Sequence, residues 1–563
     1  MVQLILKKLF NFEIIILKNS LIMKKIYLLF VLITLSCLLF GQISTPDIPW
    51  SFTNKTSDIQ NIDVYDMTPP NVQKLLQDDE QMIKYDKKLR IGAIQTVNID
   101  ANNYGTYDYL PNGDVIWRLK VTSKDAKALN TLFDYFNIPS GVKLFIYNPD
   151  KSIVLGAFTS ELNNKDNVLA IQALPGDEMI IEFNIPNNVT NLSFFHIGEI
   201  CYVYRDVLFE KSSGACNVNV ACSEGTGWTN QKNGVAKIEL RAGSYVYLCT
   251  GSLVNNTNND CTPYFLTADH CGYESSTSDL NYWVFYFNYE ATSCSGTSPQ
   301  YSNHTVTGCT LVACDTYGST NTGSDFYLVK FKNNVPTSYN PYYNGWSRST
   351  NVSNSGVGIH HPDGDIKKIS TYQNTLSSGY TTHWSVRWVA TANGHGVTEG
   401  GSSGSPLFNS NGRIIGTLTG GSSDCDATDQ ADYYGKFSYH WASNGSTSNK
   451  QLKPWLDPIN SNPTEINGRG ACGTDINTYI ISQNNIDIYP NPATDYINIQ
   501  LENSNVNSFI LNIYDILGNL ILNESVNNFQ NVYILNISNY NRGTYILNII
   551  TDKDSYSLPF IVQ

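Results

Sequence analysis

Short runs of alternating apolar and polar residues recur along the central part of the chain, separated by turns rich in Gly, Asn and Ser. Alternation with a period of two predicts β-strands. Many short strands with such turns are typical of a barrel or a sandwich, so residues 212–462 are predicted to be all-β. The clearest strands are predicted at 235–240, 283–287, 326–331, 384–389 and 413–418.

The flanking segments continue this pattern. Residues 43–211 form a β-rich unit with strands predicted at 117–121 and 142–147, although 126–136 has helical spacing and predicts a helix. Residues 463–484 have the composition of a linker. Strands predicted at 496–501, 509–514 and 545–550 then indicate a small β-sandwich over 485–563.

The first 42 residues have the pattern of a secretory signal. Met23-Lys24-Lys25 is a short basic stretch, residues 26–40 are apolar, and Gly41-Gln42 suits cleavage. This apolar run is shorter than a membrane-spanning helix needs. We expect translation to begin at Met23, with residues 1–22 an upstream segment.

Composition narrows the classes of partner. A net charge of −13 argues against nucleic acid and anionic membranes. Twelve Cys in an exported chain predict disulfides rather than metal ligands. We expect no metal and no cofactor, a structural role for His360-His361, and a monomer. With 563 residues, the chain is long enough for several domains.

Three fragments carry candidate chemistry. The turn Gly400-Gly401-Ser402-Ser403-Gly404-Ser405-Pro406 can expose the Ser403 hydroxyl, and the backbone N–H groups of Gly401 and Ser403 can point into one space as an oxyanion hole. His270 lies beside a Cys at a strand end and suits a general base. Asp325 enters a strand and can orient the imidazole. The order His270, Asp325, Ser403 is one of the known orders of a catalytic triad.

Each fragment alone also has an ordinary reading as a loop, a structural pair or a turn residue. Asp269 competes as the orienting acid, but adjacent residues of an extended segment point apart, which favours Asp325. Ser405 is a second candidate nucleophile. The occurrence of all three fragments in this order favours catalysis.

The central part resembles the bacterial lysyl endopeptidases, secreted serine proteases of the chymotrypsin fold that cut after Lys. The resemblance covers residues 212–458 and implies a double β-barrel with the site between the barrels, preceded by a pro-region at 43–211 that assists folding and blocks the site. It rests on these motifs: 213–217, 249–256, 265–272, 323–329, His360-His361-Pro362, 399–406 and Trp455-Leu456-Asp457-Pro458.

The resemblance also implies a set of disulfides, of which Cys216–Cys425 would anchor the N-terminus of the mature chain. Residue 402 is Ser, so the amine-to-Asp switch of chymotrypsin zymogens cannot operate. Cys309 and Cys314 are close in sequence, which suggests a small loop bridge. Cys261 and Cys472 are then left, and the sequence leaves their pairing open. The further implied pairs are Cys222–Cys294 and Cys249–Cys271.

Processing and specificity follow from single residues. Cleavage between Lys211 and Ser212 would release the catalytic domain, and an enzyme that cuts after Lys could make this cut itself. At the position where trypsin-like enzymes carry the Asp that binds the substrate side chain, this chain has Val397. Alignment with the lysyl endopeptidase pattern puts the substrate-binding acid at Asp432. Its rivals are Asp424, Asp426, Asp429 and Glu399.

The last unit is similar to the C-terminal sorting domains of the type IX secretion system of Bacteroidetes, on the motifs 489–493, 515–518, 543–545 and 559–563. This implies export through the periplasm and outer membrane by that machinery to a secreted or cell-surface location. A surface- or carbohydrate-binding module is the alternative for this unit. The sequence thus predicts a secreted serine endopeptidase acting on Lys-containing proteins and peptides. The alternatives are a trypsin-like or other residue-specific protease and a non-catalytic surface-binding protein.

Overall fold

The computed structural model describes ten ranges of the chain, which fall into two compact units, 1–471 and 472–563. The predicted signal segment 1–42 and the processing residues Lys211 and Ser212 lie outside them. Among the described helices, none is long and apolar enough to cross a membrane. The described ranges are 47–82, 88–206, 213–299, 304–315, 323–472, 486–501, 508–515, 520–527, 532–550 and 555–563.

A first sheet, in the N-terminal part of unit 1, has strands in the order β1-β4-β10-β6-β7, with β3 paired to β4. Its inner face contributes Trp117, Leu144 and Phe183 to a large apolar core. The strands are β1 (Val64–Asp66), β3 (Thr106–Tyr109), β4 (Val115–Thr122), β6 (Lys143–Tyr147), β7 (Val154–Phe158) and β10 (Glu178–Ile185), and α2 (Val72–Met82) precedes β2.

The helix predicted at 126–136 is wrong, because this segment is strand β5 (Ala128–Phe136). Six consecutive residues from Ala128 to Phe133 are buried. Leu129 and Phe133 pack into the first core, whereas Leu132 packs into a different cluster. A strand buried on both faces shows no two-residue alternation, so its apolar spacing imitates a helix.

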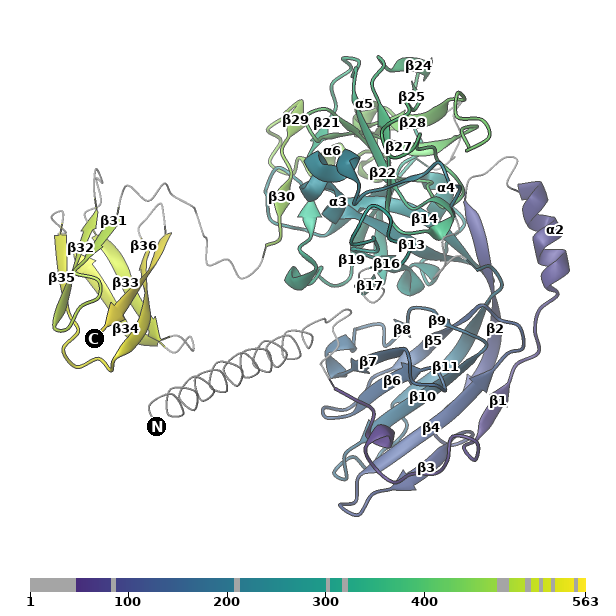
Figure 1. Cartoon of the computed structure of the whole chain (residues 1–563), viewed down its shortest axis with the longest axis horizontal. Helices are drawn as coiled ribbons and strands as arrows, with labels where there is room; N and C mark the ends of the chain where they lie inside the picture. The colour runs from purple at the N-terminus through teal and green to yellow at the C-terminus, as the bar shows by residue number, and fades with distance from the viewer. Residues whose placement is uncertain are drawn as a thin grey trace, which may run out of the picture. The chain divides into compact units, whose positions relative to one another are not determined.

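The predicted pro-region and the central part share one sheet. Strand β2 (Leu89–Ile99) pairs with β11 (Phe195–Val203) on one side and with β14 (Tyr245–Leu253) on the other. The β2–β14 register places Leu89 opposite Leu248. A 12-stranded sheet therefore continues from one part of unit 1 into the other (Figure 1).

Two β-rich halves make up the central part, as the resemblance implies, and the all-β fold class is confirmed. The first half extends the shared sheet with β13 (Val235–Ala242), β15 (Tyr264–Thr267), β16 (Val284–Tyr286), β17 (Thr305–Thr307), β18 (Cys309–Cys314) and β19 (Tyr327–Phe331). The second half is a ten-stranded sheet that includes β22 (Gly356–His360), β23 (Lys368–Tyr372), β25 (His383–Val386), β26 (Pro406–Asn409), β27 (Ile414–Gly421) and β28 (Asp432–Lys436).

Short helices and late strands complete this unit. The helices are α3 (Thr229–Gly234), α4 (Asp269–Gly272), α5 (Phe437–Ala442) and α6 (Lys453–Leu456). Strand β29 (Glu465–Ile466) pairs with β21 (Trp346–Ser347), and β30 (Arg469–Gly470) pairs with β20 (Tyr342–Tyr343). Pairing with the central part therefore extends into the residues predicted as a linker.

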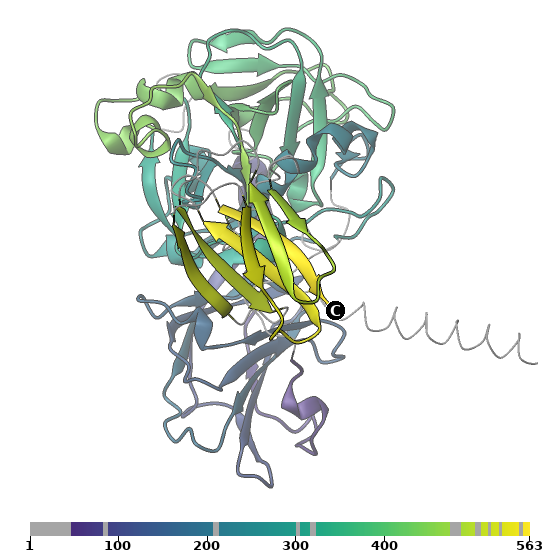
Figure 2. The same ribbon diagram turned by 90° about the vertical axis from the view of Figure 1, so that its left-hand side faces the viewer.

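The C-terminal unit has two antiparallel sheets that enclose one apolar core, including Ile497, Leu511 and Leu547 (Figures 1 and 2). One sheet has the order β31-β32-β35 and the other β34-β33-β36-β37. This arrangement agrees with the predicted small β-sandwich. The strands are β31 (Ile486–Tyr489), β32 (Tyr496–Leu501), β33 (Ser508–Asp515), β34 (Leu520–Asn527), β35 (Val532–Asn536), β36 (Gly543–Ile550) and β37 (Ser555–Val562).

Candidate active site

His270 lies on the single helical turn α4, directly after strand β15. Its Nδ1 is 2.7 Å from Oδ2 of Asp325, and its backbone N–H donates to Oδ1 of the same carboxylate at 2.9 Å. The disulfide between Cys249 on β14 and Cys271 ties this turn to the neighbouring strand. The candidate base is therefore fixed at both its ring and its backbone.

Asp325, rather than its rival Asp269, bonds the imidazole ring. It is fully buried and its φ of 60° is left-handed, a strained conformation for a residue other than Gly. Burial alone would raise the pKa of Asp325. The charge and hydrogen bonds of His270, with a hydrogen bond from Thr419, outweigh burial and lower this pKa to about 2. The carboxylate is therefore ionised over the whole neutral range.

The lowered pKa of Asp325 predicts a specific loss of stability in acid. The folded-state pKa is below the ordinary value of 3.8 for Asp, so the stabilisation is complete above about pH 4 and is lost as pH falls toward 2. At neutral pH it amounts to roughly 2 kcal/mol. In a Ser403→Ala background, which prevents self-digestion, we expect the melting temperature of Asp325→Asn to lie below that of its parent at pH 6 and to approach it at pH 2.5. A difference that stays constant with pH would contradict this coupling.

The turn that carries Ser403 packs against the segment leading to His270. The backbone N–H of Thr250 donates to Ser403 O at 2.8 Å, and Thr250 Oγ1 donates to Gly401 O at 2.8 Å. At Gly404, where φ is +78°, a Cβ would lie 2.0 Å from Thr267 Oγ1 and 2.8 Å from Ala268 N. Only Gly fits there. The serine turn and the base are thus held in one neighbourhood by backbone contacts.

The Ser403 hydroxyl is buried, and it makes no hydrogen bond within the described part of the chain. His270 and Asp325 are joined, whereas a Ser403–His270 hydrogen bond is not formed. Such bonds are often long in ligand-free sites and tighten only when substrate binds. A buried hydroxyl without a partner, next to a carboxylate–imidazole pair, suits a nucleophile.

The predicted oxyanion donors are available. Within the turn, Ser402 N donates to Glu399 O and Ser405 N to Ser402 O, but the N–H groups of Gly401 and Ser403 have no acceptor among the described residues. The φ of +83° at Gly401 is one that Gly adopts readily. These two N–H groups, one of them that of Ser403 itself, have no acceptor among the described residues and can therefore bind a developing negative charge.

Asp432 begins β28 and is fully buried. Its Oδ2 accepts from Trp388 Nε1 at 2.7 Å, from Thr398 Oγ1 at 2.7 Å and from Ser423 Oγ at 2.6 Å. Among its rivals, Asp424, Asp426 and Asp429 are not fully buried, and Glu399 is half-buried. The structure thus places a buried carboxylate behind residues 398 and 423.

A cavity of about 260 Å³ lies in front of these residues. Its lining comes from the start of the serine turn, from the end of β27 and the residues after it, from the turn at Asp363, and from the predicted pro-region. Lys88 and Leu89 contribute from that region, at the start of β2. The other lining residues are Asp363, Thr398, Glu399, Gly400, Gly421, Ser422, Ser423 and Asp424.

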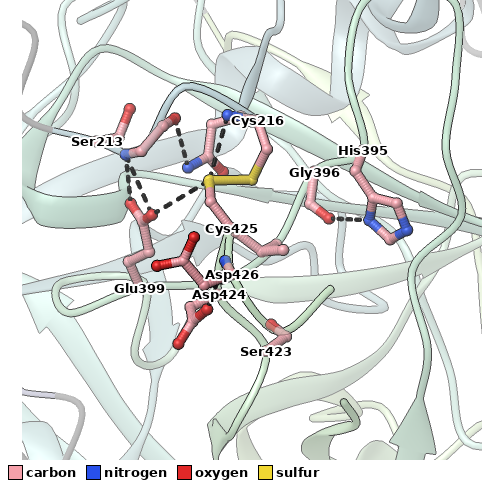
Figure 3. The surroundings of a disulfide bond; sticks show 12 residues. Ser213, Cys216, His395, Gly396, Glu399, Ser423, Asp424, Cys425 and Asp426 are labelled. Carbon is pink, nitrogen blue, oxygen red and sulfur yellow. Dashed lines mark hydrogen bonds between the residues drawn. A yellow bond between two sulfur atoms is a disulfide. The ribbon is translucent and has the colours of Figure 1, made fainter. Parts of the chain in front are cut away.

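The three disulfides implied by the resemblance are formed. Around Cys216–Cys425, the carboxylate of Glu399 accepts from the backbone N–H of Gly214 at 3.1 and 3.2 Å (Figure 3). This contact ties the segment that follows the predicted processing site to the serine turn. Cys261 and Cys472 are also disulfide-bonded.

The bridge predicted between Cys309 and Cys314 is wrong. Cys309 is a buried free thiol, and the two residues are the first and last of strand β18. Five steps along a strand separate Cα atoms by about 16 Å, whereas a disulfide needs less than about 7 Å. Closeness in sequence misleads when the intervening backbone is extended.

The sequence did not predict the polar side chains that hydrogen-bond Asp325 and the serine turn. Thr419 gives its hydroxyl hydrogen to Asp325 and accepts from His383 Nε2, with 3.0 Å between Oγ1 and Nε2. Burial lowers the pKa of His383 to about 4, which keeps this donor neutral. His360, treated as structural, bonds Ser402 Oγ through Nδ1 at 2.9 Å and so braces the serine turn. Lone polar residues on strands give no signal of such contacts.

Comparisons with known proteins agree with the resemblance. Residues 210–435 match the family model of the lysyl endopeptidase C-terminal domain, and residues 487–563 match that of the secretion system C-terminal sorting domain. These matches confirm the resemblance of the central part to the lysyl endopeptidases and of the last unit to the sorting domains.

One relative is a lysyl endopeptidase of Pseudomonas aeruginosa, which is 31% identical over 293 residues. The alignment covers 47% of this chain and 60% of the relative, so the chain spans well under the relative's whole length. A solved thermostable serine protease, AL20 from an extremophilic microorganism, aligns at 14% identity with a TM-score of 0.26, covering 37% of this chain and 92% of that one. This score is too low to establish a shared fold.

Proposed function

We propose that the chain is a secreted serine endopeptidase that hydrolyses peptide bonds after Lys. The observation that carries the proposal is the buried His270–Asp325 pair, set beside a Gly-rich turn whose Ser403 hydroxyl has no partner among the described residues. The match of residues 210–435 to the lysyl endopeptidase family supports it.

The chemistry is acyl transfer in two halves. His270 Nε2 takes the proton of Ser403 as Oγ attacks the scissile carbonyl carbon, and Asp325 stabilises the imidazolium that forms. The N–H groups of Gly401 and Ser403 hold the oxyanion. The imidazolium then protonates the leaving amine, which leaves an acyl-enzyme on Ser403. In the second half, water gives a proton to His270 and attacks the ester, which releases the acid and restores Ser403.

Preference for Lys is assigned to Asp432. A Lys ammonium entering the cavity needs a negative charge, because burying it unpaired is costly. Asp432 is the candidate acid that is fully buried behind the wall of the cavity. The same preference would let the enzyme cut its own chain after Lys211 and release a catalytic domain that begins at Ser212.

Export follows the sorting domain. The match of residues 487–563 supports delivery to the outside or the surface of a Bacteroidetes-like cell by the type IX machinery. Disulfides in the central part fit an oxidising compartment.

Two alternatives predict different outcomes. A trypsin-like enzyme on this scaffold would cut after Arg as well as Lys. A non-catalytic surface-binding protein would cut nothing, and the joined His270–Asp325 pair disfavours it.

Mapping the fragments from a digested protein mixture tests the proposal directly. We expect new C-termini at Lys and few at Arg or Glu. Asp432→Asn should lower kcat/KM for Lys substrates by about 10²-fold or more, because the cation then enters a site without its charge. Its reaction with a fluorophosphonate probe should persist, since Ser403 is untouched. Unchanged Lys preference in this variant would remove Asp432 from the pocket.

A further inference from the structure

We propose that Glu274 and the ring of Tyr247 form a subsite for a basic side chain, on the leaving-group side of the bond that is cut. Lys88 of the predicted pro-region occupies this subsite in the uncut chain. The inference rests on the proposed function and deepens it, because it names a second substrate residue that the same active site selects.

The ammonium of Lys88 contacts residues of the central part. Its Nζ is 2.7 Å from Oε2 of Glu274 and 4.4 Å from the ring centre of Tyr247. The ring centre of Tyr273 lies 5.4 Å from the same atom. Lys88 is only 3% exposed, and Lys is almost never buried so deeply unless it is paired. A carboxylate and aromatic rings around one ammonium form a site that binds cations.

The groups that hold Lys88 belong to the central part and remain there when the pro-region leaves. Tyr247 lies on β14, and Glu274 is the second residue after α4. The Tyr273 hydroxyl donates to Oε1 of Glu274 at 3.0 Å, and its backbone N–H donates to Asp269 O at 2.8 Å. Burial alone would raise the pKa of Glu274, but hydrogen bonds from Lys88 and Tyr273 outweigh burial and lower this pKa. The carboxylate is therefore ionised at neutral pH.

The subsite adjoins both parts of the candidate active site. The helical turn α4 carries His270 and leads to Glu274. Lys88 and Leu89 line the cavity beside the serine turn. The Cβ of Leu89 is 3.4 Å from where a Cβ on Gly400 of that turn would lie. Successive residues at the start of β2 therefore contact the segments that carry the candidate base and the candidate nucleophile.

Strand β2 indicates how a substrate reaches this subsite. It pairs antiparallel with β14, with Leu89 opposite Leu248, and an extended peptide can add to a strand edge in the same way. Side chains of successive strand residues point to opposite faces. In the register of β2, a peptide residue at the Lys88 position points to Glu274, and the residue before it points to the side of Leu89, along the cavity. The cavity then takes the Lys before the scissile bond, and the subsite takes the residue directly after it.

The chemistry of the subsite favours either basic side chain and disfavours acids. An ammonium or a guanidinium can lie over the ring of Tyr247 and pair with Glu274. A neutral side chain gains neither contact, and a carboxylate is repelled by Glu274. We therefore expect kcat/KM to fall in the order Arg, Gln, Glu for the residue that follows the scissile Lys.

Three peptides that differ only in this residue test the order with the processed enzyme. We expect the Arg peptide to exceed the Gln peptide about tenfold in kcat/KM, the combined scale of a part-exposed ion pair and one cation–π contact. Sodium chloride at about 1 M should lower this ratio, because salt screens exposed charges. Mass spectrometry of the products identifies the bond that is cut in each peptide.

Four variants separate the subsite from general effects of charge. Glu274→Gln should bring the Arg/Gln ratio to within about threefold of unity, and Glu274→Arg should make the Glu peptide better than the Arg peptide. Tyr247→Phe keeps the ring and should keep the ratio. Glu465→Gln is the matched control, because Glu465 is as exposed as Glu274, at 45% against 43%, and is likewise ion-paired, with Arg413. It should keep the ratio of the wild type.

Each outcome decides for or against the subsite. Equal kcat/KM for the three peptides in the wild type overturns it, and so does an Arg preference that survives in Glu274→Gln or falls equally in Glu465→Gln. If the wild type cuts no Lys peptide at all, the proposed function itself fails. Cutting after Lys without regard to the next residue refutes the inference alone.

Discussion

Ser403→Ala is expected to lower kcat/KM for a Lys-containing peptide by about 10⁴-fold or more, the scale at which serine proteases lose activity without their nucleophile. The Ser403 hydroxyl is buried without a hydrogen bond to any described residue, and the backbone of its turn contacts the segment that leads to His270. Peptide hydrolysis and labelling by a fluorophosphonate probe measure the loss independently.

Ser405→Ala is the matched control, because Ser405 is the second candidate serine of the same turn and is equally buried. The Ser405→Ala variant should still react with the fluorophosphonate probe. Ser405 directly precedes β26 and follows the N–H groups of Gly401 and Ser403 in the turn. Labelling that persists in Ser403→Ala and disappears in Ser405→Ala would transfer the role of nucleophile. A wild-type protein that takes no label would favour the surface-binding alternative.

The sequence predicted the parts of the site that depend on local chemistry. Each of the three candidate residues needs a particular local backbone conformation: a Gly-rich turn for the Ser, a strand end for the His and a strand start for the Asp. The residues beside each one indicate that conformation. The structure joins His270 to Asp325 as expected. The pairings of Cys216, Cys222 and Cys249 followed from the resemblance, because spacing alone cannot choose among pairings.

The sequence could not predict what depends on packing between distant strands. The segment 128–136 is buried on both faces by partners that its own pattern does not reveal, so a strand was mistaken for a helix. Thr398, Ser423 and Trp388 meet at Asp432 from three separate segments. Each is an ordinary polar or aromatic residue in its own segment. Only the fold brings them to the same carboxylate.

The hydrophobic pattern of the sequence did not predict that the pro-region and the central part share one sheet. This sheet suggests how the uncut chain could be kept inactive. Strand β2 adds itself to β14, the strand that carries Thr250 and its contacts to the serine turn. Leu89 and Ile91 of β2 are buried in the same apolar cluster as Leu248 of β14. At the start of β2, Lys88 and Leu89 line the cavity, and Lys88 Nζ is 2.7 Å from Glu274. Two residues of the predicted pro-region therefore form part of the wall of the candidate pocket.

Blocking the processing cut should consequently yield a latent enzyme. In Lys211→Gln the pro-region stays covalently attached, and a tethered occupant acts at an effective concentration near the millimolar range. We expect kcat/KM to be about 10²-fold or more below that of the processed wild type. N-terminal sequencing identifies the chain in each preparation, and peptide hydrolysis measures its activity.

Lys165→Gln supplies the control, because this exposed Lys lies in the same region, away from the predicted cut and from β2. It should be processed and active like the wild type. If Lys211→Gln remains uncut yet hydrolyses peptides as fast as Lys165→Gln, the added strand does not close the cleft. If Lys211→Gln is uncut and latent, trace amounts of trypsin should restore little of its activity, because trypsin does not cut after Gln. Cutting the wild-type precursor after Lys211 should restore the activity fully. Strand addition then explains why one cut, far along the chain from Ser403, controls access to it.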